Sequence, residues 1–137
     1  MLYDDQNIFA RIIRNELPAI KVYEDEQVLA FMDIMPQAEG HTLVVPKTPA
    51  ITLLDLPPDA AAYTIQIVQK IAQAMKVALD VQGIVLMQLS GASAGQTVPH
   101  VHFHLIPSSV HELGKHALSM GDQEKIKALA EKIKAEL

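Results

Sequence analysis

The sequence predicts an α+β fold, and three observations lead to that prediction. Short runs of β-branched and aliphatic residues recur along the chain, bounded by turn residues, which is typical of strands. One long stretch, from about Pro58 to Leu79, has the apolar spacing of a helix. Shorter helical patterns stand near both ends, so the expected order is α-β-β-β-α-β-β-α. Neighbouring strands can then pair antiparallel, with one long helix crossing between the third and fourth strands.

The first half of the chain contains one short helix and three strands. Asp4 and Asp5 precede the helix, and we expect them to act as its caps or first-turn acids. Its apolar residues recur at helical spacing, and they are Ile8, Phe9, Ile12 and Ile13. The strands are expected at residues 21–24, 28–32 and 41–46.

The second half begins with the long helix, which is apolar on two sides. We therefore expect one side to meet the sheet and the other to meet a second copy of the protein. Residues 84–89 are a nearly continuous apolar run, which predicts a buried strand. A loop of small residues leads from there to a last strand that carries three histidines. A final helix is expected at about 121–137, with acidic residues near its start and lysines later.

Composition excludes several classes of function. A chain of 137 residues is long enough for a single domain with its own core, at residues 1–137. The net charge is −5 and no dense Lys/Arg run occurs, which argues against nucleic-acid partners. Without cysteine there is neither a disulfide nor thiol catalysis. The N-terminus lacks the basic region of a signal peptide, and no apolar run could cross a membrane, so we expect a cytoplasmic protein.

The most informative pattern is the alternation of His100, His102 and His104 with Val101 and Phe103. On a strand the three imidazoles would share one face, about 6.6 Å apart. A solvated strand face, a metal site and catalysis by imidazole are all compatible with this pattern. A His-x-His pair can bind zinc, but three such rings span too far to converge on one ion. We favour catalysis, because histidine can act as a nucleophile and as a proton donor near neutral pH, and we expect no metal and no cofactor.

These residues resemble the histidine-triad (HIT) superfamily of nucleotide hydrolases and transferases. Residues 100–106 carry the motif His-Val-His-Phe-His-Leu-Ile, and residues 95–98 read Gly-Gln-Thr-Val. The segments 31–36 and 40–47 complete the resemblance, whose core covers about residues 8–107. The branch that hydrolyses purine nucleoside phosphoramidates is closest in appearance. The resemblance implies a five-stranded antiparallel sheet per subunit, extended across a homodimer.

The resemblance also implies roles for four histidines. His102 would attack the α-phosphorus and form a nucleotidyl-histidine, which water then cleaves. The backbone carbonyl of His100 would accept the ring proton of His102. His104 would contact the phosphate or assist the leaving group, and a histidine there rather than a glutamine favours hydrolysis over nucleotidyl transfer. His41 would complete the cluster.

The remaining site residues are assigned in the same way. Thr97 would contact the phosphate, Gln96 would lie near the scissile bridge, and Gly95 could bring its backbone N–H to the phosphate. Asp33 would accept hydrogen bonds from the ribose hydroxyls. The other nucleoside-binding residues implied are Ile8, Phe9, Ile12, Phe31, Ile34 and Leu89.

This sequence departs from the family pattern in three places. Many bacterial members bind zinc through two cysteines and a histidine at positions that here hold Asn7, Ala10 and Pro49, so we expect that zinc site to be absent. Leu89 replaces an asparagine that often ends the fourth strand. Ser108 stands where relatives often carry arginine, and the chain has no tryptophan.

The leading functional hypothesis is a hydrolase that releases an AMP-like nucleoside monophosphate from a phosphoramidate or a related adenylated amine. One alternative is a hydrolase of dinucleoside polyphosphates. Another is a nucleotide-binding homodimer with incidental catalysis, and a third is a metalloprotein.

Overall fold

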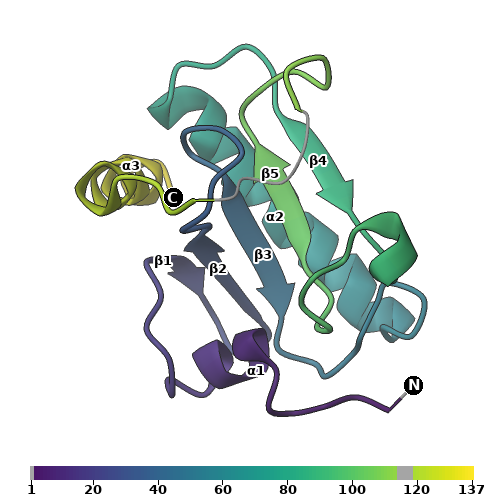
Figure 1. Ribbon diagram of the computed structural model, residues 1–137. Helices are drawn as coiled ribbons and strands as arrows, with labels where there is room; N and C mark the ends of the chain where they lie inside the picture. Colours follow the sequence, from purple (N-terminus) through teal and green to yellow (C-terminus); the bar gives the residue numbers. More distant parts are fainter. Residues whose placement is uncertain (1, 114–118) are drawn as a thin grey trace.

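A five-stranded sheet forms the centre of the computed structural model, which describes residues 2–113 and 119–137 (Figure 1). Its strands are β1 (Lys21–Glu24), β2 (Val28–Met32), β3 (Thr42–Pro46), β4 (Val85–Gln88) and β5 (Phe103–Ile106). The spatial order is β1-β2-β3-β5-β4, so β1 and β4 are the edges. All neighbouring strands pair antiparallel. The predicted α+β class and antiparallel sheet are confirmed.

Helices lie on both faces of this sheet. Within the described residues they are α1 (Ile8–Ile13), α2 (Pro58–Ala78) and α3 (Gln123–Ala135), with a 3₁₀ turn η1 (Ala92–Ala94) before β5. In Figure 1, α2 runs behind the sheet, whereas α1 lies in front of it at the lower end. None of these helices is sufficiently long and apolar to span a membrane.

Strand β2 shows how the sheet serves two cores. All five of its residues are buried. Val28, Ala30 and Met32 belong to the core that includes residues of α2 and α3. Leu29 and Phe31 belong instead to a smaller core with residues of α1. Because successive strand residues point to opposite faces, one short apolar strand contributes to both cores, and the smaller core lies beneath the candidate site.

The helices lie where the sequence predicted them, although two are slightly shorter, and one predicted cap is wrong. Asn7, not Asp4 or Asp5, caps α1, because its side-chain oxygen accepts the N–H of Ala10 at 2.9 Å. The carboxylate of Asp4 instead accepts the N–H of Gln6 in the preceding turn. The long helix ends one residue earlier than predicted, and Asp122 caps α3 within the predicted boundary.

Residues 84–89 contain a strand, as predicted, but the prediction that this strand is buried is wrong. Within the part of the chain that the structure describes, strand β4 lies at an edge of the sheet and pairs with β5 alone. Its residues are half-buried apart from Leu86, which is 48% exposed. An apolar run does not reveal whether its strand is central or at an edge.

The second apolar side of α2 is also open in the single chain, where Ile65 and Val77 are exposed.

Candidate functional site

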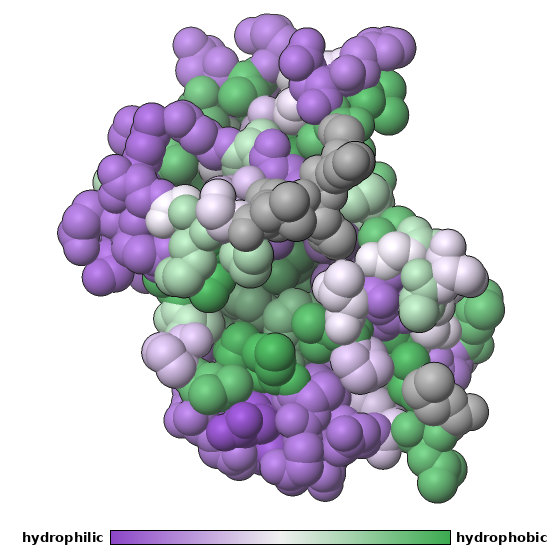
Figure 2. All heavy atoms as spheres, viewed as in Figure 1, coloured by the Kyte–Doolittle hydropathy of each residue, from purple (hydrophilic) through white to green (hydrophobic). Residues whose placement is uncertain are grey.

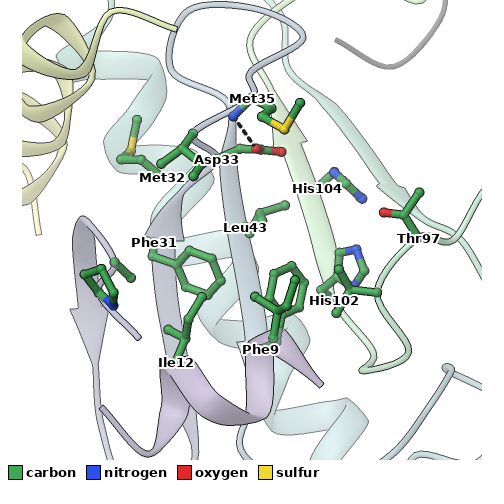
Figure 3. Close-up of a pocket in the computed structure, with 15 residues that line it drawn as sticks. Phe9, Ile12, Phe31, Met32, Asp33, Met35, Leu43, Thr97, His102 and His104 are labelled. Atoms are coloured by element: carbon green, nitrogen blue, oxygen red, sulfur yellow. Dashed lines mark hydrogen bonds between the residues drawn. The ribbon is translucent and has the colours of Figure 1, made fainter. Parts of the chain in front are cut away.

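A cavity of about 420 Å³ opens on the face of the sheet that α1 partly covers. Figure 2 shows hydrophobic residues gathered in this hollow, with hydrophilic residues around it. Phe9, Ile12, Phe31 and Leu43 form one side, as Figure 3 shows. The other side is polar, and its residues are Asp33, Thr97, His102 and His104. The cavity therefore combines an apolar region with a row of groups that can bind and transfer protons.

The tautomer of His102 is fixed by a hydrogen bond to the backbone. Its Nδ1 lies 2.6 Å from the carbonyl oxygen of His100. A carbonyl can only accept, so Nδ1 carries the ring proton and Nε2 carries a lone pair. The ring of Phe9 meets the imidazole edge to face, with the centroids 4.8 Å apart. Both contacts hold the imidazole in one orientation at the cavity wall.

A second chain of hydrogen bonds fixes His41 and His104. The backbone N–H of Gln37 donates to Nδ1 of His41 at 3.0 Å, so the proton of His41 lies on Nε2. That nitrogen is 2.9 Å from Nδ1 of His104, to which it donates. A neutral His104 then carries its own proton on Nε2. His41 is buried and does not line the cavity, whereas its partner His104 does.

Asp33 lies beside this chain, at the polar end of the cavity. One carboxylate oxygen accepts the backbone N–H of Met35 at 2.8 Å, the dashed contact in Figure 3. The other is 3.5 Å from Nε2 of His41. The carboxylate is therefore held in place while it lines the cavity.

His100 does not contribute its ring to the cavity. The ring is buried, its Nε2 lies 2.7 Å from the carbonyl of Pro46, and its Nδ1 lies 2.5 Å from the hydroxyl of Tyr3. Burial lowers the pKa of His100, and the hydrogen bond to Pro46 opposes that effect. Val101, Phe103 and Leu105 share one core, as the predicted alternation requires. Of the three imidazoles on the other positions, only His102 and His104 line the cavity, because Tyr3 and Pro46 engage the ring of His100.

The rings of His102 and His104 do lie together, but closer than an ideal strand spacing. Their centroids are 4.9 Å apart, and both rings line the cavity. Two imidazoles at this separation can contact the same small group, such as a phosphate.

The loop before the histidines places Thr97 at the cavity but turns Gln96 away from it. The side-chain oxygen of Gln96 accepts the N–H of Gly91 at 2.8 Å. Its side-chain nitrogen donates to the carbonyls of Ile51 and Val98 at 2.7 and 3.0 Å. Gln96 thus fixes the loop, and its place near the scissile bridge, which the resemblance implies, stays a prediction.

Gly95 and Leu89 also lie outside the cavity lining. Gly95 ends η1 with a φ of 109°, a left-handed conformation that favours glycine. A Cβ there would lie 3.3 Å from the side chain of Leu89. Leu89 therefore packs under the loop, although the sequence placed it among the nucleoside-binding residues.

Several lining residues were missed by sequence reasoning, and they are Pro18, Ala19, Met32, Met35, Leu43 and Val98. Leu43 could have been found, because it is the cross-strand partner of Phe31 and such partners share a face of the sheet. Pro18, Ala19, Met35 and Val98 lie in loops, whose paths no periodic pattern reveals.

Asp33, His41 and His104 lie close together, but their donor atoms do not suit a metal ion well. One donor atom each of Asp33, His41 and His104 lies within 4.8 Å of the others. However, Gln37 occupies Nδ1 of His41, so Nε2 bears the proton and offers no lone pair to a metal. A metal there would have to displace that proton and break the hydrogen bond to His104.

The three positions that the resemblance links to zinc hold no zinc ligands here. The side chain of Asn7 is engaged in the α1 cap and donates to the carbonyl of Asp4. Ala10 and Pro49 have no donor atom in their side chains. These side chains do not fit a zinc ion.

Comparisons with known proteins agree with this geometry. The model of the HIT domain family matches residues 14–111. A HIT-like protein of Methanocaldococcus jannaschii is 47% identical over 100 residues, which cover 73% of this chain and 77% of that protein. An adenosine 5′-monophosphoramidase of Schizosaccharomyces pombe is 35% identical over 136 residues, 95% of this chain and 97% of the relative. A crystal structure of a HIT-like protein from Bartonella henselae, with an unknown ligand, superimposes over 100% of both chains with a TM-score of 0.92 and 47% identity. The chain therefore belongs to the HIT family, as its histidine motif predicted.

Proposed function

We propose that this protein hydrolyses purine nucleoside 5′-phosphoramidates, or related adenylated amines, to the nucleoside monophosphate. The 2.6 Å hydrogen bond from Nδ1 of His102 to the carbonyl of His100 carries the proposal. It directs the lone pair of the imidazole to Nε2, at the wall of a cavity of about 420 Å³. The similarity to an adenosine 5′-monophosphoramidase supports the same substrate class.

The reaction would proceed in two displacements at phosphorus. In the first, Nε2 of His102 bonds to phosphorus, the P–N bond breaks, and the departing amine takes up one proton. The positive charge that develops on His102 is stabilised by the carbonyl of His100, which accepts its Nδ1–H. In the second, water attacks phosphorus, the P–Nε2 bond breaks, and one proton is returned to solvent. Nε2–H of His104 and the hydroxyl of Thr97 would hydrogen-bond the phosphate oxygens or the leaving group.

The two sides of the cavity would bind the two parts of the nucleoside. Phe9, Phe31 and Leu43 provide the apolar surface for a planar base. Asp33 lies at the polar end, where its carboxylate already accepts the N–H of Met35. A carboxylate has about four acceptor positions, so it can also accept the ribose hydroxyls.

The direct test is His102→Ala with adenosine 5′-phosphoramidate as substrate. We expect AMP release to fall roughly 10³-fold or more, because the nucleophile itself is lost. The wild type should form an acid-labile adduct of adenylate mass that the variant lacks. His111→Ala is the matched control, since this histidine is exposed and outside the cavity, and its rate should stay at the wild-type value. Equal activity of the wild type and His102→Ala would discard the proposal.

The same assay, run with a second substrate, distinguishes a phosphoramidate hydrolase from a dinucleoside polyphosphate hydrolase. Faster cleavage of diadenosine polyphosphates than of the phosphoramidate would replace the proposed substrate class. Binding of AMP without any turnover would indicate a nucleotide-binding protein instead.

We also propose a homodimer in which the sheet continues across β4. Strand β4 is an edge, where unpaired backbone groups can accept another strand. Its Leu86 is 48% exposed, and a paired strand or a neighbouring subunit would cover it. Light scattering at micromolar concentration should give twice the chain mass, and a monomeric mass would rule the dimer out.

A further inference from the structure

The N-terminal segment reaches the histidine cluster through one side chain. The hydroxyl of Tyr3 lies 2.5 Å from Nδ1 of His100, although the two residues are 97 positions apart. Their rings meet edge to face, with centroids 5.6 Å apart and an interplanar angle of 66°. Tyr3 does not line the cavity, and His100 is the member of the histidine cluster that its hydroxyl contacts.

The direction of this hydrogen bond follows from the other side of the ring. Nε2 of His100 is 2.7 Å from the carbonyl of Pro46, which can only accept, so Nε2 carries the proton. Nδ1 therefore has a lone pair, and the hydroxyl of Tyr3 must donate to it. Burial lowers the pKa of His100 and raises that of Tyr3, and both shifts favour this neutral arrangement. The imidazole is thus held from both sides.

The segment that carries Tyr3 is tied to α1. The side chain of Asn7 donates to the carbonyl of Asp4 at 2.7 Å, and Arg14 donates to the carbonyl of Asp5 at 2.7 Å. The same helix carries Phe9, whose ring packs against His102. One N-terminal unit therefore contacts two neighbouring members of the histidine cluster.

We propose that Tyr3 is a positioning residue for the nucleophile. By holding the imidazole of His100, it holds the backbone carbonyl of the same residue in line with Nδ1 of His102, at 2.6 Å. That carbonyl determines which nitrogen of His102 carries the proton and which one can attack phosphorus. The kinetic part of this inference rests on the proposed function, whereas the effect on the tautomer does not.

The test is Tyr3→Phe, which removes only the hydroxyl. Nitrogen-15 NMR of the imidazole side chains should show the proton of His102 on Nδ1 in the wild type and a new Nε2–H population in the variant. With adenosine 5′-phosphoramidate, kcat should fall about tenfold while KM changes less than about twofold, because one neutral hydrogen bond is lost away from the substrate.

Tyr23→Phe is the matched control, since it removes a hydroxyl that donates to Asp25 rather than to a histidine. It should lower the melting temperature and leave both kcat and the histidine spectrum unchanged. If His102 stays entirely in the Nδ1–H form in Tyr3→Phe, the role of Tyr3 is overturned. If the wild type turns over no phosphoramidate, the proposed function fails, yet the spectrum of Tyr3→Phe still decides the role of Tyr3.

Discussion

Two clusters of hydrogen-bonded side chains join distant parts of this chain, and they differ in what their protons can do. The first surrounds Asp25, whose carboxylate accepts hydroxyl protons from Tyr23 and Tyr63 at 2.7 and 2.5 Å. It also accepts the N–H groups of Gln27 and Val28, each at 2.7 Å. Because Tyr63 lies on α2, this cluster fastens the β1–β2 hairpin to the long helix.

All of these donors point inward to one acceptor. Burial alone would raise the pKa of Asp25, but the hydrogen bonds from Tyr63, Tyr23 and the two amides outweigh it and lower the pKa to about 2. The hydrogen bond to Asp25 in turn raises the pKa of Tyr23. No group of this cluster lines the cavity, so its contribution is to stability.

The second cluster contains four histidines, and each of these rings has both a donor and an acceptor nitrogen. Backbone groups of Gln37 and Pro46 fix the outer rings, His41 and His100. His102 and His104 then meet the cavity. A carboxylate that accepts hydrogen bonds from four donors, such as Asp25, holds two parts of the chain together. Histidines whose tautomers are fixed by hydrogen bonds, and two of which line a cavity, can instead bind and transfer protons there.

Of the substitutions that test the difference between the two clusters, His41→Phe should have the largest effect, a fall in kcat. The substitution removes the donor to Nδ1 of His104, so His104 loses its fixed tautomer. We expect kcat for the phosphoramidate to fall about 100-fold, the lower range of acid–base contributions. His41→Gln should recover part of this loss, because an amide can donate to His104. If both variants lose stability but keep kcat, the histidine cluster only stabilises the fold, as the Asp25 cluster does.

The converse change is Asp25→Asn, which should affect stability and spare activity. A neutral amide accepts the tyrosine and backbone protons less strongly, and one of its two polar atoms is itself a donor. We expect the free energy of unfolding to fall by about 1–2 kcal/mol, a value reduced for the partial exposure of the group. Urea unfolding measures this loss, and kcat should stay within about twofold of the wild type. A large fall in kcat would show that the two clusters are coupled.

A smaller effect concerns pH. The pKa of Asp25 is about 2 in the folded chain, below the value of about 3.9 in an unfolded chain. Between these values the unfolded state binds more protons, so the stabilisation is present above about pH 4 and is lost as pH falls toward 2. The difference in unfolding free energy between the wild type and Asp25→Asn should therefore shrink over this range. A constant difference would show that the charge of Asp25 is not what stabilises the hairpin.

Local features of the fold could be predicted from the sequence. The strands at 21–24 and 28–32 have the predicted bounds, because turn residues and alternation are properties of adjacent residues. The edge position of β4 could not be predicted, since it depends on how β5 inserts between β3 and β4. Local sequence determines an element, and its neighbours in the sheet determine its burial.

In the site, too, some features could be predicted from the sequence and others could not. Thr97, His102 and His104, which the sequence motif singled out, line one cavity, whereas their roles in the reaction stay predictions. That the ring of His100 is engaged away from the cavity was not predictable, because this depends on a contact with Tyr3 that spans 97 positions. The hydrogen bond of Gln96 to Ile51 was not predictable for a similar reason, since Ile51 lies in a distant loop.

The smallest effect on stability and kcat is expected at the ion pair of Lys125 and Glu39, although this contact is as short as those of Asp25. Lys125 and Glu39 lie 2.5 Å apart, and this pair links α3 to the loop that follows Asp33. Glu39 raises the pKa of Lys125, yet the two side chains are 54% and 69% exposed. Water and salt screen such a pair, so Lys125→Ala should leave both the unfolding midpoint and kcat unchanged. A fall in kcat without a loss of stability would mean that α3 holds the loop beside the cavity in position, which would extend the reactive cluster to the C-terminal helix.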